Sequence, residues 1–598
     1  MDPNAPQWKK FVRIKRPTVK HVRVRARKIE GATMRHAHRF IISRWANLRD
    51  VRRHAFGWLV LAALLIVATS IQLYWVQNAH SARQAVDGGT YAEGVIGRLD
   101  TLNPIYASTQ SERSASYLLF SSLLRYDREN NLESDLAQSW KVSADGKAYT
   151  VVLREDALWH DGKPVTADDI VFTLKLIKNP QTRSNLYRTW QDIAVKAVSK
   201  YEVEFTLPSA YAPFPHALTF GILPEHMLEN VSPARLREHP FNRDPVGSGP
   251  FEFKSIQIIN PDADRVVLQA ERNEAYYRGP VKLDRYQLHT FQDHDDLRQG
   301  FMSREINAAT ELTQSDIRTI VDQLPTSIVN DAPLYNGTYA FFQTDRPILS
   351  DQAVRKALLK ATDRRAIQKD VADYASALDG PLLPEQIRGI SDLKQAPYDT
   401  AGAKADLEAA GWVLKNGTVR EKDGQALQLS VIAPRSGDFP EVLEAISKQW
   451  RSVGVDVKTQ VVDTKTFEQN ILTPRAYDVL IYELALGADP DVFAYWHSSQ
   501  ASVRGFNLSN YKSAVADDAL LSARGRSEMD LRSAKYRGFF EQWLRDAPAV
   551  ALYRPHLRYI ATDSSVSVDR DQPVIDTLNR FNNLDDWTVQ QGTQFKTP

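Results

Sequence analysis

Between residues 427 and 483 the chain alternates strands and helices in a way that few folds permit. Apolar, β-branched runs at 427–433, 455–462 and 477–483 are typical of buried strands, and the amphipathic segments 439–453 and 465–472 predict helices. Three strands joined through helices at these lengths predict a parallel sheet with right-handed crossovers. The fold class is therefore α/β, in which ligands sit beyond the carboxyl ends of the strands.

The segment 139–179 predicts a hairpin followed by a capped helix. Asp145-Gly146 indicates a two-residue turn, because glycine tolerates the positive φ that a type I′ turn requires. The returning strand alternates apolar and polar residues, so one of its faces is expected to be buried: Tyr149, Val151 and Leu153. Thr166 is placed to cap the helix that follows. His160 has no second His, Cys or carboxylate at metal spacing, so we expect a structural role for it.

At 598 residues the chain exceeds what one hydrophobic core usually holds, so at least two globular units are expected. A hydrophobic content of 43% excludes a wholly disordered chain. The chain has no cysteine, which excludes disulfides, thiolate metal sites, cysteine nucleophiles and a lipid-modified cysteine.

The charge of the chain is divided unevenly. Residues 1–54 carry 16 Lys and Arg against Asp2, Glu30 and Asp50, a formal charge of +13, so the remainder carries −11. Such a cluster suits nucleic acid or anionic lipid. The uncharged segment 55–76 that follows is about long enough to cross a membrane as a helix, and cations on one side predict that this side is cytoplasmic.

We therefore expect a basic cytoplasmic tail at 1–54, one transmembrane helix at 55–76 and an extracytoplasmic body, which makes nucleic-acid binding unlikely. The tail either lies as a basic helix on the anionic inner leaflet or is a solvated run of charges. A cleaved signal peptide is the alternative to a retained anchor, but the positive region is much longer than signal peptides have.

Several segments resemble one family of proteins. The segment 139–169 contains in order SW, DG, YT, LR, WHDGKP and TADD, and this pattern resembles the signature of the family 5 extracellular solute-binding proteins. That family serves peptide, nickel and some oligosaccharide ABC importers. Further segments at 100–107, 244–253, 272–291, 338–367, 505–511 and 548–561 are similar to family elements. The resemblance runs from about residue 90 to about 590.

The resemblance implies a two-lobed, periplasmic-binding-protein-like (Venus flytrap) fold with an extra inserted domain. We expect a polar linker at 77–89. The remaining segments are then lobe I at 90–122, 246–337 and 555–598, the inserted domain at 123–245, and lobe II at 338–554.

The resemblance also suggests where a ligand binds. In peptide-binding members an aspartate shortly before the Asp-Pro element receives the free amine of the peptide, and alignment through Asp489 places Leu486 at that position. Leucine cannot pair with an ammonium group. Glu483 either supplies the missing anion or is a solvated strand end. Asp489 is expected to hold its loop by backbone hydrogen bonds.

Other candidates for ligand contact lie near the predicted lobe junction. Asn507 belongs to the segment 505–511. Five aromatic residues are placed to stack on peptide side chains or sugar rings, although we expect most aromatics at such spacing to be core: Tyr106, Trp190, Tyr339, Phe341 and Trp496.

The resemblance favours a membrane-anchored solute receptor with a monomeric body. It would capture oligopeptide-like ligands and deliver them to the permease and ATPase subunits of an ABC importer. Alternatives are a transmembrane sensor or interaction protein, or binding of an oligosaccharide or metal complex. The sequence contains no recognisable hydrolase, zincin or Walker motif, so we expect no enzyme. His497 has no second His or thiolate nearby, so we expect no metal site and no cofactor.

Overall fold

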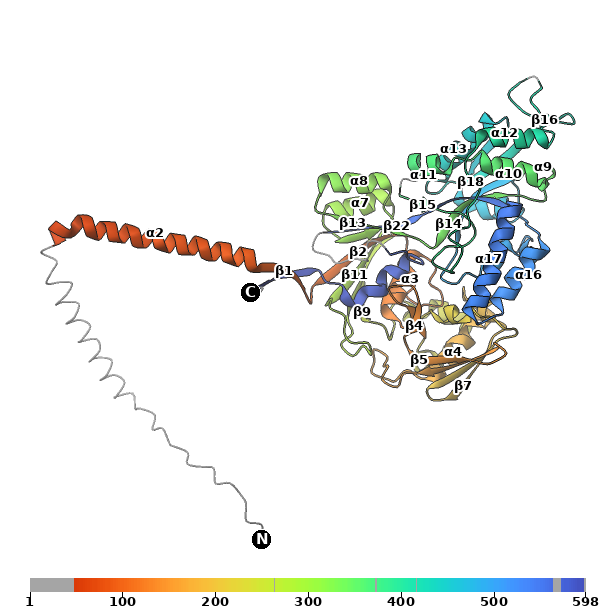
Figure 1. The fold of residues 1–598 in the computed structure, drawn as a ribbon. Coiled ribbons are helices and arrows are strands. Elements are labelled where there is room, and N and C mark those ends of the chain that lie inside the picture. The colour runs from red at the N-terminus through yellow and green to blue at the C-terminus, as the bar shows by residue number, and fades with distance from the viewer. Residues whose placement is uncertain (1–47, 263, 372–373, 416, 563–571, 596–598) are drawn as a thin grey trace, which may run out of the picture. The chain divides into compact units, whose positions relative to one another are not determined.

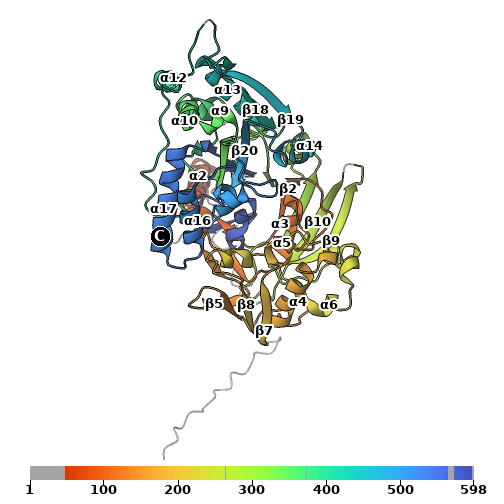
Figure 2. The ribbon, with the colours of Figure 1, turned by 90° about the vertical axis from the view of Figure 1, so that its right-hand side faces the viewer.

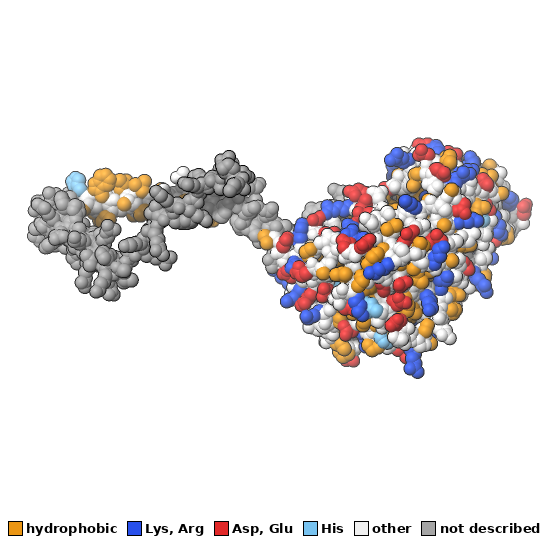
Figure 3. All heavy atoms as spheres, turned by 90° about the horizontal axis from the view of Figure 1, so that it is seen from below, with side chains coloured by type: hydrophobic (Ala, Val, Ile, Leu, Met, Phe, Trp, Pro, Cys, Tyr) orange, Lys and Arg blue, Asp and Glu red, His pale blue; other side chains and the backbone are white. Residues whose placement is uncertain are grey.

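The computed structural model describes residues 48–262, 264–371, 374–415, 417–562 and 572–595. The chain divides into two compact units, residues 1–84 with 592–598, and residues 85–591, which we call the body. In the first unit, helix α2 (Leu48–His80) contains an apolar span at His54–Trp75 that is long enough to cross a membrane by length and composition. The apolar side chains described along this span are exposed, as the orange spheres of Figure 3 show.

The structure differs from the expected linker at 77–89. Helix α2 continues to His80, and β1 (Ser81–Val86) forms a two-stranded sheet with β23 (Gln590–Phe595). The partner strand comes from the far end of the chain, so local polarity gave no sign of it.

Lobe I, as we define it in the structure, is built on a mixed seven-stranded sheet. Its order is β13 (Ile328–Pro333), β22 (His556–Ala561), β12 (Ala308–Thr310), β2 (Thr90–Ile96), β11 (Arg285–Phe291), β10 (Arg265–Arg272) and β9 (Phe251–Asn260). Its helices include α3 (Gln110–Leu119), α7 (His294–Met302), α8 (Gln314–Gln323) and the 3-10 segment η9 (Thr577–Asp586). Strand β2 is parallel to both β11 and β12.

Lobe II is built on a six-stranded sheet. Its order is β15 (Ser376–Ala377), β21 (Ala549–Arg554), β14 (Asn336–Phe342), β20 (Val479–Ala485), β18 (Gln428–Pro434) and β19 (Asp456–Val462). The strands β20, β18 and β19 are parallel neighbours joined through α13 (Phe439–Ser452), α14 (Thr464–Phe467) and a π-helical turn at Glu468–Leu472. This confirms the predicted strand-helix-strand-helix-strand unit.

Further helices complete lobe II around this sheet. They are α9 (Pro347–Ser350), α10 (Gln352–Lys360), α11 (Arg364–Asp370), α12 (Thr400–Ala409), α15 (Phe493–Trp496), α16 (Ala514–Arg524) and α17 (Met529–Asp546). Two separate hydrophobic clusters contain the buried residues of this lobe. One includes Trp450 of α13 and the other Trp543 of α17, so both faces of the sheet are covered, as parallel strands require.

A four-stranded antiparallel sheet forms the inserted domain, with the order β5 (Ala137–Val142), β6 (Ala148–Leu153), β8 (Glu202–Thr206) and β7 (Ala194–Ser199). Figures 1 and 2 place this sheet and α4 (Ala167–Ile177) at the end of the body away from α12 and α13. The predicted hairpin is confirmed, with Gly146 at φ +70°, but its loop spans five residues, 143–147, instead of two. Thr166 and Asp169 form a capping box at the start of α4.

The chain crosses between the two larger sheets twice, from β13 to β14 and from β21 to β22. Two crossings with a separate core on each side define the expected two-lobed fold with an inserted domain, and the prediction of fold class is confirmed. The expected lobe boundary at residue 337 falls inside β14. The other predicted boundaries stay predictions.

Candidate functional site

A cavity of about 980 Å³ opens at the carboxyl ends of the three parallel strands of lobe II. Its wall contains Pro434 at the end of β18, Thr464 just after β19 and Ala485 at the end of β20. Successive parallel strands end at one edge of a sheet, and the helices that follow begin there, so this edge collects side chains from three separate chain segments. The volume is at the upper end for small-molecule sites.

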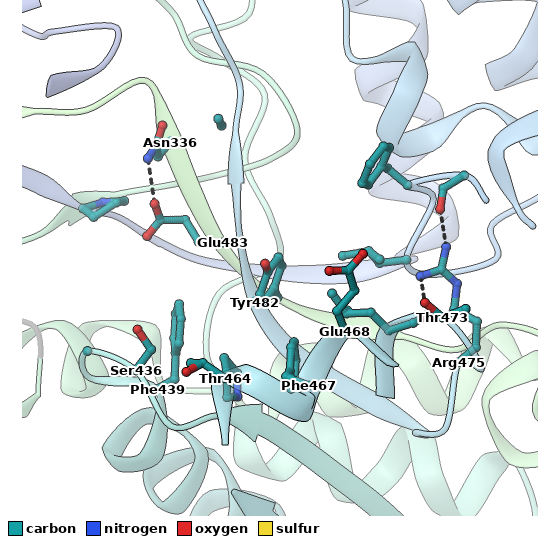
Figure 4. Close-up of a pocket in the computed structure, with 18 of the residues that line it drawn as sticks. Asn336, Ser436, Phe439, Thr464, Phe467, Glu468, Thr473, Arg475, Tyr482 and Glu483 are labelled. Atoms are coloured by element: carbon teal, nitrogen blue, oxygen red, sulfur yellow. Dashed lines mark hydrogen bonds between the residues drawn. The ribbon is translucent and has the colours of Figure 1, made fainter. Parts of the chain in front are cut away.

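Three aromatic rings line one side of this cavity. Tyr482 of β20 stacks with Phe467 of α14 at 5.7 Å between ring centroids and 22° between planes, and with Phe439 of α13 at 6.5 Å and 29°. Figure 4 shows these rings gathered on one side of the cavity. Each ring comes from a different element of the parallel unit, so the packing of this unit holds the aromatic wall in place.

Glu483 lies beside Tyr482 on β20 and is half-buried. The side-chain amide of Asn336, on the neighbouring strand β14, donates a hydrogen bond to Glu483 Oε1 at 2.6 Å (Figure 4). Burial raises the pKa of the Glu483 carboxyl above its usual value. The hydrogen bond from Asn336 lowers this pKa in part, and the nearby carboxylate of Asp438 raises it. This is a partly desolvated acid at the edge of a ligand-sized cavity.

Arg475 lines another part of the cavity wall, and its guanidinium is held by backbone carbonyl groups. Its guanidinium donates hydrogen bonds to the carbonyl oxygens of Leu472, Ser502 and Gly505 at 2.6 to 3.2 Å. Two other cations, Arg188 of the inserted domain and Arg504, line the cavity with exposed side chains. The cavity therefore has residues of both signs on its rim.

A second hollow of about 600 Å³ lies where the two lobes meet. Glu311 and Thr313 belong to the lobe I side, and Tyr374 and Asp438 to the lobe II side. Tyr374 and Asp438 also line the first cavity, and the Tyr374 hydroxyl donates a hydrogen bond to Asp438 Oδ2. The two hollows thus adjoin at this pair of residues.

Among the residues that the sequence suggested, Glu483 lines the first cavity and the other eight do not. Leu486, which the sequence resemblance suggested for the amine-binding position, is buried in the lobe II core, where its backbone N–H donates to the Tyr335 carbonyl at 2.7 Å. A charged side chain at this place would need a partner that the surrounding apolar cluster does not offer.

The predicted aromatic contacts are core residues in this structure. Tyr339, Phe341 and Trp496 pack against one another with centroids 5.3 to 5.9 Å apart and are almost fully buried. Trp190 is buried against Phe214 in the inserted domain. Tyr339 and Phe341 lie on β14, and Trp190 and Trp496 lie on short helices. All four rings are packed in hydrophobic cores and therefore do not line the cavity.

Tyr106 is also buried, with the Arg237 guanidinium 4.5 Å from its ring centroid. Asn507 is buried and hydrogen-bonds the backbone of His497 and Tyr511, which fixes a turn. Asp489 accepts from the backbone N–H of Asp491 at 2.9 Å, as expected. It also pairs with Arg532 at 2.7 Å, an ion pair that the sequence did not reveal.

Sequence reasoning missed the aromatic wall and Asn336. Phe439 and Phe467 lie in the first turn or two after a parallel strand, and Tyr482 lies near the end of one. The rule that ligands sit at the carboxyl edge, applied to all three strands instead of to the last one, would have found them. In the described residues no group of three or more His, Asp or Glu side chains is arranged to hold a metal ion.

The matches to known proteins agree with this architecture. Residues 131–505 match the model of the bacterial extracellular solute-binding proteins, family 5. The chain belongs to this family, which is a family of extracytoplasmic solute receptors and not of enzymes.

Individual relatives are similar over most of their length. The oligopeptide-binding protein AppA of Bacillus subtilis is 28% identical over 509 residues, which cover 83% of this chain and 92% of that protein. The structure of AppA in complex with a nonapeptide has a TM-score of 0.67 at 25% identity, and it covers 85% of this chain and all of that one. The structure of NikZ from Campylobacter jejuni in complex with Ni(L-His) has a TM-score of 0.68 at 26% identity, and covers 83% of this chain and 99% of that one.

Proposed function

We propose that this protein captures peptides between its two lobes and delivers them to the permease of an ABC importer. The observation that carries the proposal is the cavity at the carboxyl edge of β18, β19 and β20 in a member of the solute-binding family. The peptide complex of AppA supports peptide as the ligand class. A stacked aromatic wall beside a carboxylate suits a ligand that has both apolar and polar groups.

Capture would proceed by closure of lobe I onto lobe II. The first cavity belongs mainly to lobe II, and the second hollow brings in Glu311 and Thr313 of lobe I. A ligand favours the closed form only if it contacts both lobes there and gains affinity from it. Binding and release are the whole task of such a receptor, and we propose that the chain catalyses no reaction.

We propose further that helix α2 anchors the protein in the membrane and that the body lies outside the cytoplasm. The apolar span at His54–Trp75, with a preceding tail rich in Lys and Arg, supports this topology. The expected contact of the tail with anionic lipid falls on residues 1–47, outside the described residues, and stays a prediction.

Native mass spectrometry of the full chain in lipid nanodiscs tests the ligand class. The protein is expressed in rich medium and sprayed before and after mild unfolding. We expect the release of a series of peptide masses, together with a higher unfolding temperature of the loaded protein, because a ligand that binds only the native state stabilises it. Release of a sugar or a metal chelate, or an unfolding temperature that no peptide pool changes, would contradict the proposal.

A further inference from the structure

The inserted domain contacts lobe II, although the chain does not connect the two directly. The chain enters the inserted domain after α3 and leaves it into β9, both of which belong to lobe I. It reaches lobe II only through the crossings from β13 to β14 and from β21 to β22. A rotation of the lobes about these crossings therefore changes every contact between the inserted domain and lobe II. Such a contact stabilises one angle between the lobes.

Arg524, the last residue of α16 in lobe II, is the centre of this contact. Its guanidinium carbon lies 4.1 Å from the ring centroid of Phe493 in lobe II and 4.8 Å from that of Tyr211 in the inserted domain. The guanidinium donates a hydrogen bond to Asp491, which is nearly buried, at 2.9 Å. The backbone carbonyl of Arg524 accepts a hydrogen bond from the Ala212 N–H at 2.9 Å. Lobe II thus holds the cation in place, and the inserted domain supplies an aromatic face and a backbone donor to it.

A histidine of the same inserted-domain segment extends the contact. His216 Nδ1 shares a hydrogen bond with the Tyr126 hydroxyl at 2.9 Å, and its Nε2 lies 3.6 Å from Asp489 Oδ2 of lobe II. Asp489 is paired within lobe II with Arg532 at 2.7 Å, so this side of the contact is fixed before the inserted domain arrives. We call the whole contact the latch; it consists of Tyr211, Ala212 and His216 on the inserted domain and of Asp489, Asp491 and Arg524 on lobe II.

The inserted domain and lobe II also share the first cavity. Arg188 of the inserted domain lines this cavity, and most of its other lining residues belong to lobe II. A ligand that contacts Arg188 and lobe II together binds better when the inserted domain is docked on lobe II, so the ligand favours the latched form. Because such coupling is reciprocal, a contact that stabilises the latched form raises the affinity for the ligand.

We propose that the latch holds the body in its ligand-retaining form, and that the contact of Tyr211 with Arg524 sets how long a ligand stays bound. The inference rests on the proposed receptor function and names the regulation of its cavity. None of the latch residues lines the cavity. The latch therefore acts on the release of ligand and not on the choice of ligand.

Disulfide trapping tests whether the latch forms when a ligand is bound. The chain has no cysteine, so the double variant Ala210→Cys/Gly525→Cys contains the only two thiols. A Cβ atom on Gly525 lies 4.0 Å from the Ala210 carbonyl oxygen, so the two positions are close together across the contact. The full chain in nanodiscs is treated with a mild oxidant, with and without a tryptic digest of casein. We expect the digest to accelerate cross-linking roughly threefold or more, and the oxidised protein to retain peptide until it is reduced.

A variant of the aromatic face tests the effect on release. Tyr211→Ala should speed the loss of bound peptide from the loaded, washed protein roughly threefold to tenfold, because it removes the cation–π contact with Arg524. Native mass spectrometry over time follows the loss. Tyr201→Ala is the matched control, since Lys200 lies 4.9 Å from the Tyr201 ring centroid and both residues belong to the inserted domain. This control should release peptide at the wild-type rate. Thermal unfolding checks that both variants are folded.

The outcomes distinguish the latch from the function on which it rests. Cross-linking that bound peptide does not accelerate, or release from Tyr211→Ala at the wild-type rate, overturns the latch and leaves the peptide receptor standing. Thiols that do not cross-link in the presence of bound peptide overturn it as well. If the wild-type chain binds no peptide from the digest, the receptor function and the latch are both overturned.

Discussion

At the scale of single residues, His160 joins two segments that lie far apart in the sequence. Its Nδ1 accepts a hydrogen bond from the Gly247 N–H at 3.2 Å, and its Nε2 donates to the Gly249 carbonyl at 3.1 Å. These partners require the neutral imidazole with its proton on Nε2. Burial lowers the pKa of His160 to about 4. Its role is structural, as the sequence suggested.

The titration of His160 makes stability depend on pH. In the unfolded chain this group has a pKa near about 6.5, so below that pH the unfolded state binds a proton that the native state does not. We expect the free energy of unfolding to fall between pH 6.5 and about 4 by up to roughly 3 kcal/mol from this group. Above pH 6.5 its contribution is fully present.

The measurement is denaturant unfolding of the wild-type chain and of His160→Gln at pH 7 and pH 5. Gln cannot titrate, so the wild-type chain should lose about 1 to 2 kcal/mol more than the variant between these pH values. Equal losses in the two proteins would show that His160 is protonated equally in the native and unfolded states.

Glu483 and Leu486 show how two positions three residues apart, at and just after the end of β20, differ in surroundings. Leu486 points into a closed apolar core, whereas Glu483 faces the cavity and Asn336. An anion at position 483 keeps partial contact with water and with a ligand. The same group at position 486 would have neither.

At the scale of elements, the loop before β9 depends on a close approach that only glycine permits. A Cβ atom on Gly247 would lie 1.9 Å from the Leu119 carbonyl oxygen at the end of α3. The backbone of Ser248 and Gly249 donates to this same oxygen. The loop is thus held against the end of α3 by backbone contacts that a larger residue would break.

We expect Gly247→Ala to destabilise the body by about 2 kcal/mol or more, because backbone atoms on both sides must shift. Gly538→Ala is the matched control. Gly538 lies within helix α17, where a Cβ meets nothing within 4 Å, so alanine should stabilise by about 0.5 to 1 kcal/mol through its higher helix propensity. Thermal unfolding of both variants should give shifts of opposite sign. Shifts of the same sign would contradict this account of the loop.

The parallel unit of lobe II explains why the cavity lies where it does. Strands β18, β19 and β20 end at one edge, and α13 and α14 begin there, so β18, β20, α13 and α14 all contribute residues to the wall. Short connections between them leave little freedom for the three rings. We attribute the preorganised aromatic wall to this topology, since each ring is fixed by the element on which it lies.

At the scale of the whole molecule, helix α2 is either retained as a membrane anchor or cleaved off as part of a signal sequence. If α2 is a retained anchor, the full chain expressed in a bacterial host should stay in the membrane fraction after alkaline carbonate washing and dissolve only in detergent. A variant in which a cleavable signal peptide replaces residues 1–84 should appear as a soluble extracytoplasmic protein. It should also bind the same peptides, because the cavity lies within the body.

Mass spectrometry of the purified full chain distinguishes a retained anchor from a cleaved signal sequence. A retained anchor gives the mass of the whole sequence. A mature protein that begins near residues 79–82, together with release from washed membranes, would show that α2 belongs to a cleaved signal sequence.

Much of this organisation could be read from the sequence. Hydrophobic periodicity and turn residues are local signals, so the parallel unit at 427–483, the hairpin with Gly146 and the cap at Thr166 were predictable to within a few residues. The apolar span at 55–76 could be recognised from the sequence in the same way. Motif order pointed to the family, and the family implied two lobes and an inserted domain.

Only the tertiary structure decided which side chains reach the cavity. Both faces of this mixed sheet are buried, so alternation along β14 and β20 cannot tell the core rings of Tyr339 and Phe341 from the cavity ring of Tyr482. The pairing of Asn336 with Glu483 depends on strand register across 147 residues of chain. Such contacts are set by how distant elements pack, and no local pattern in the sequence records that packing.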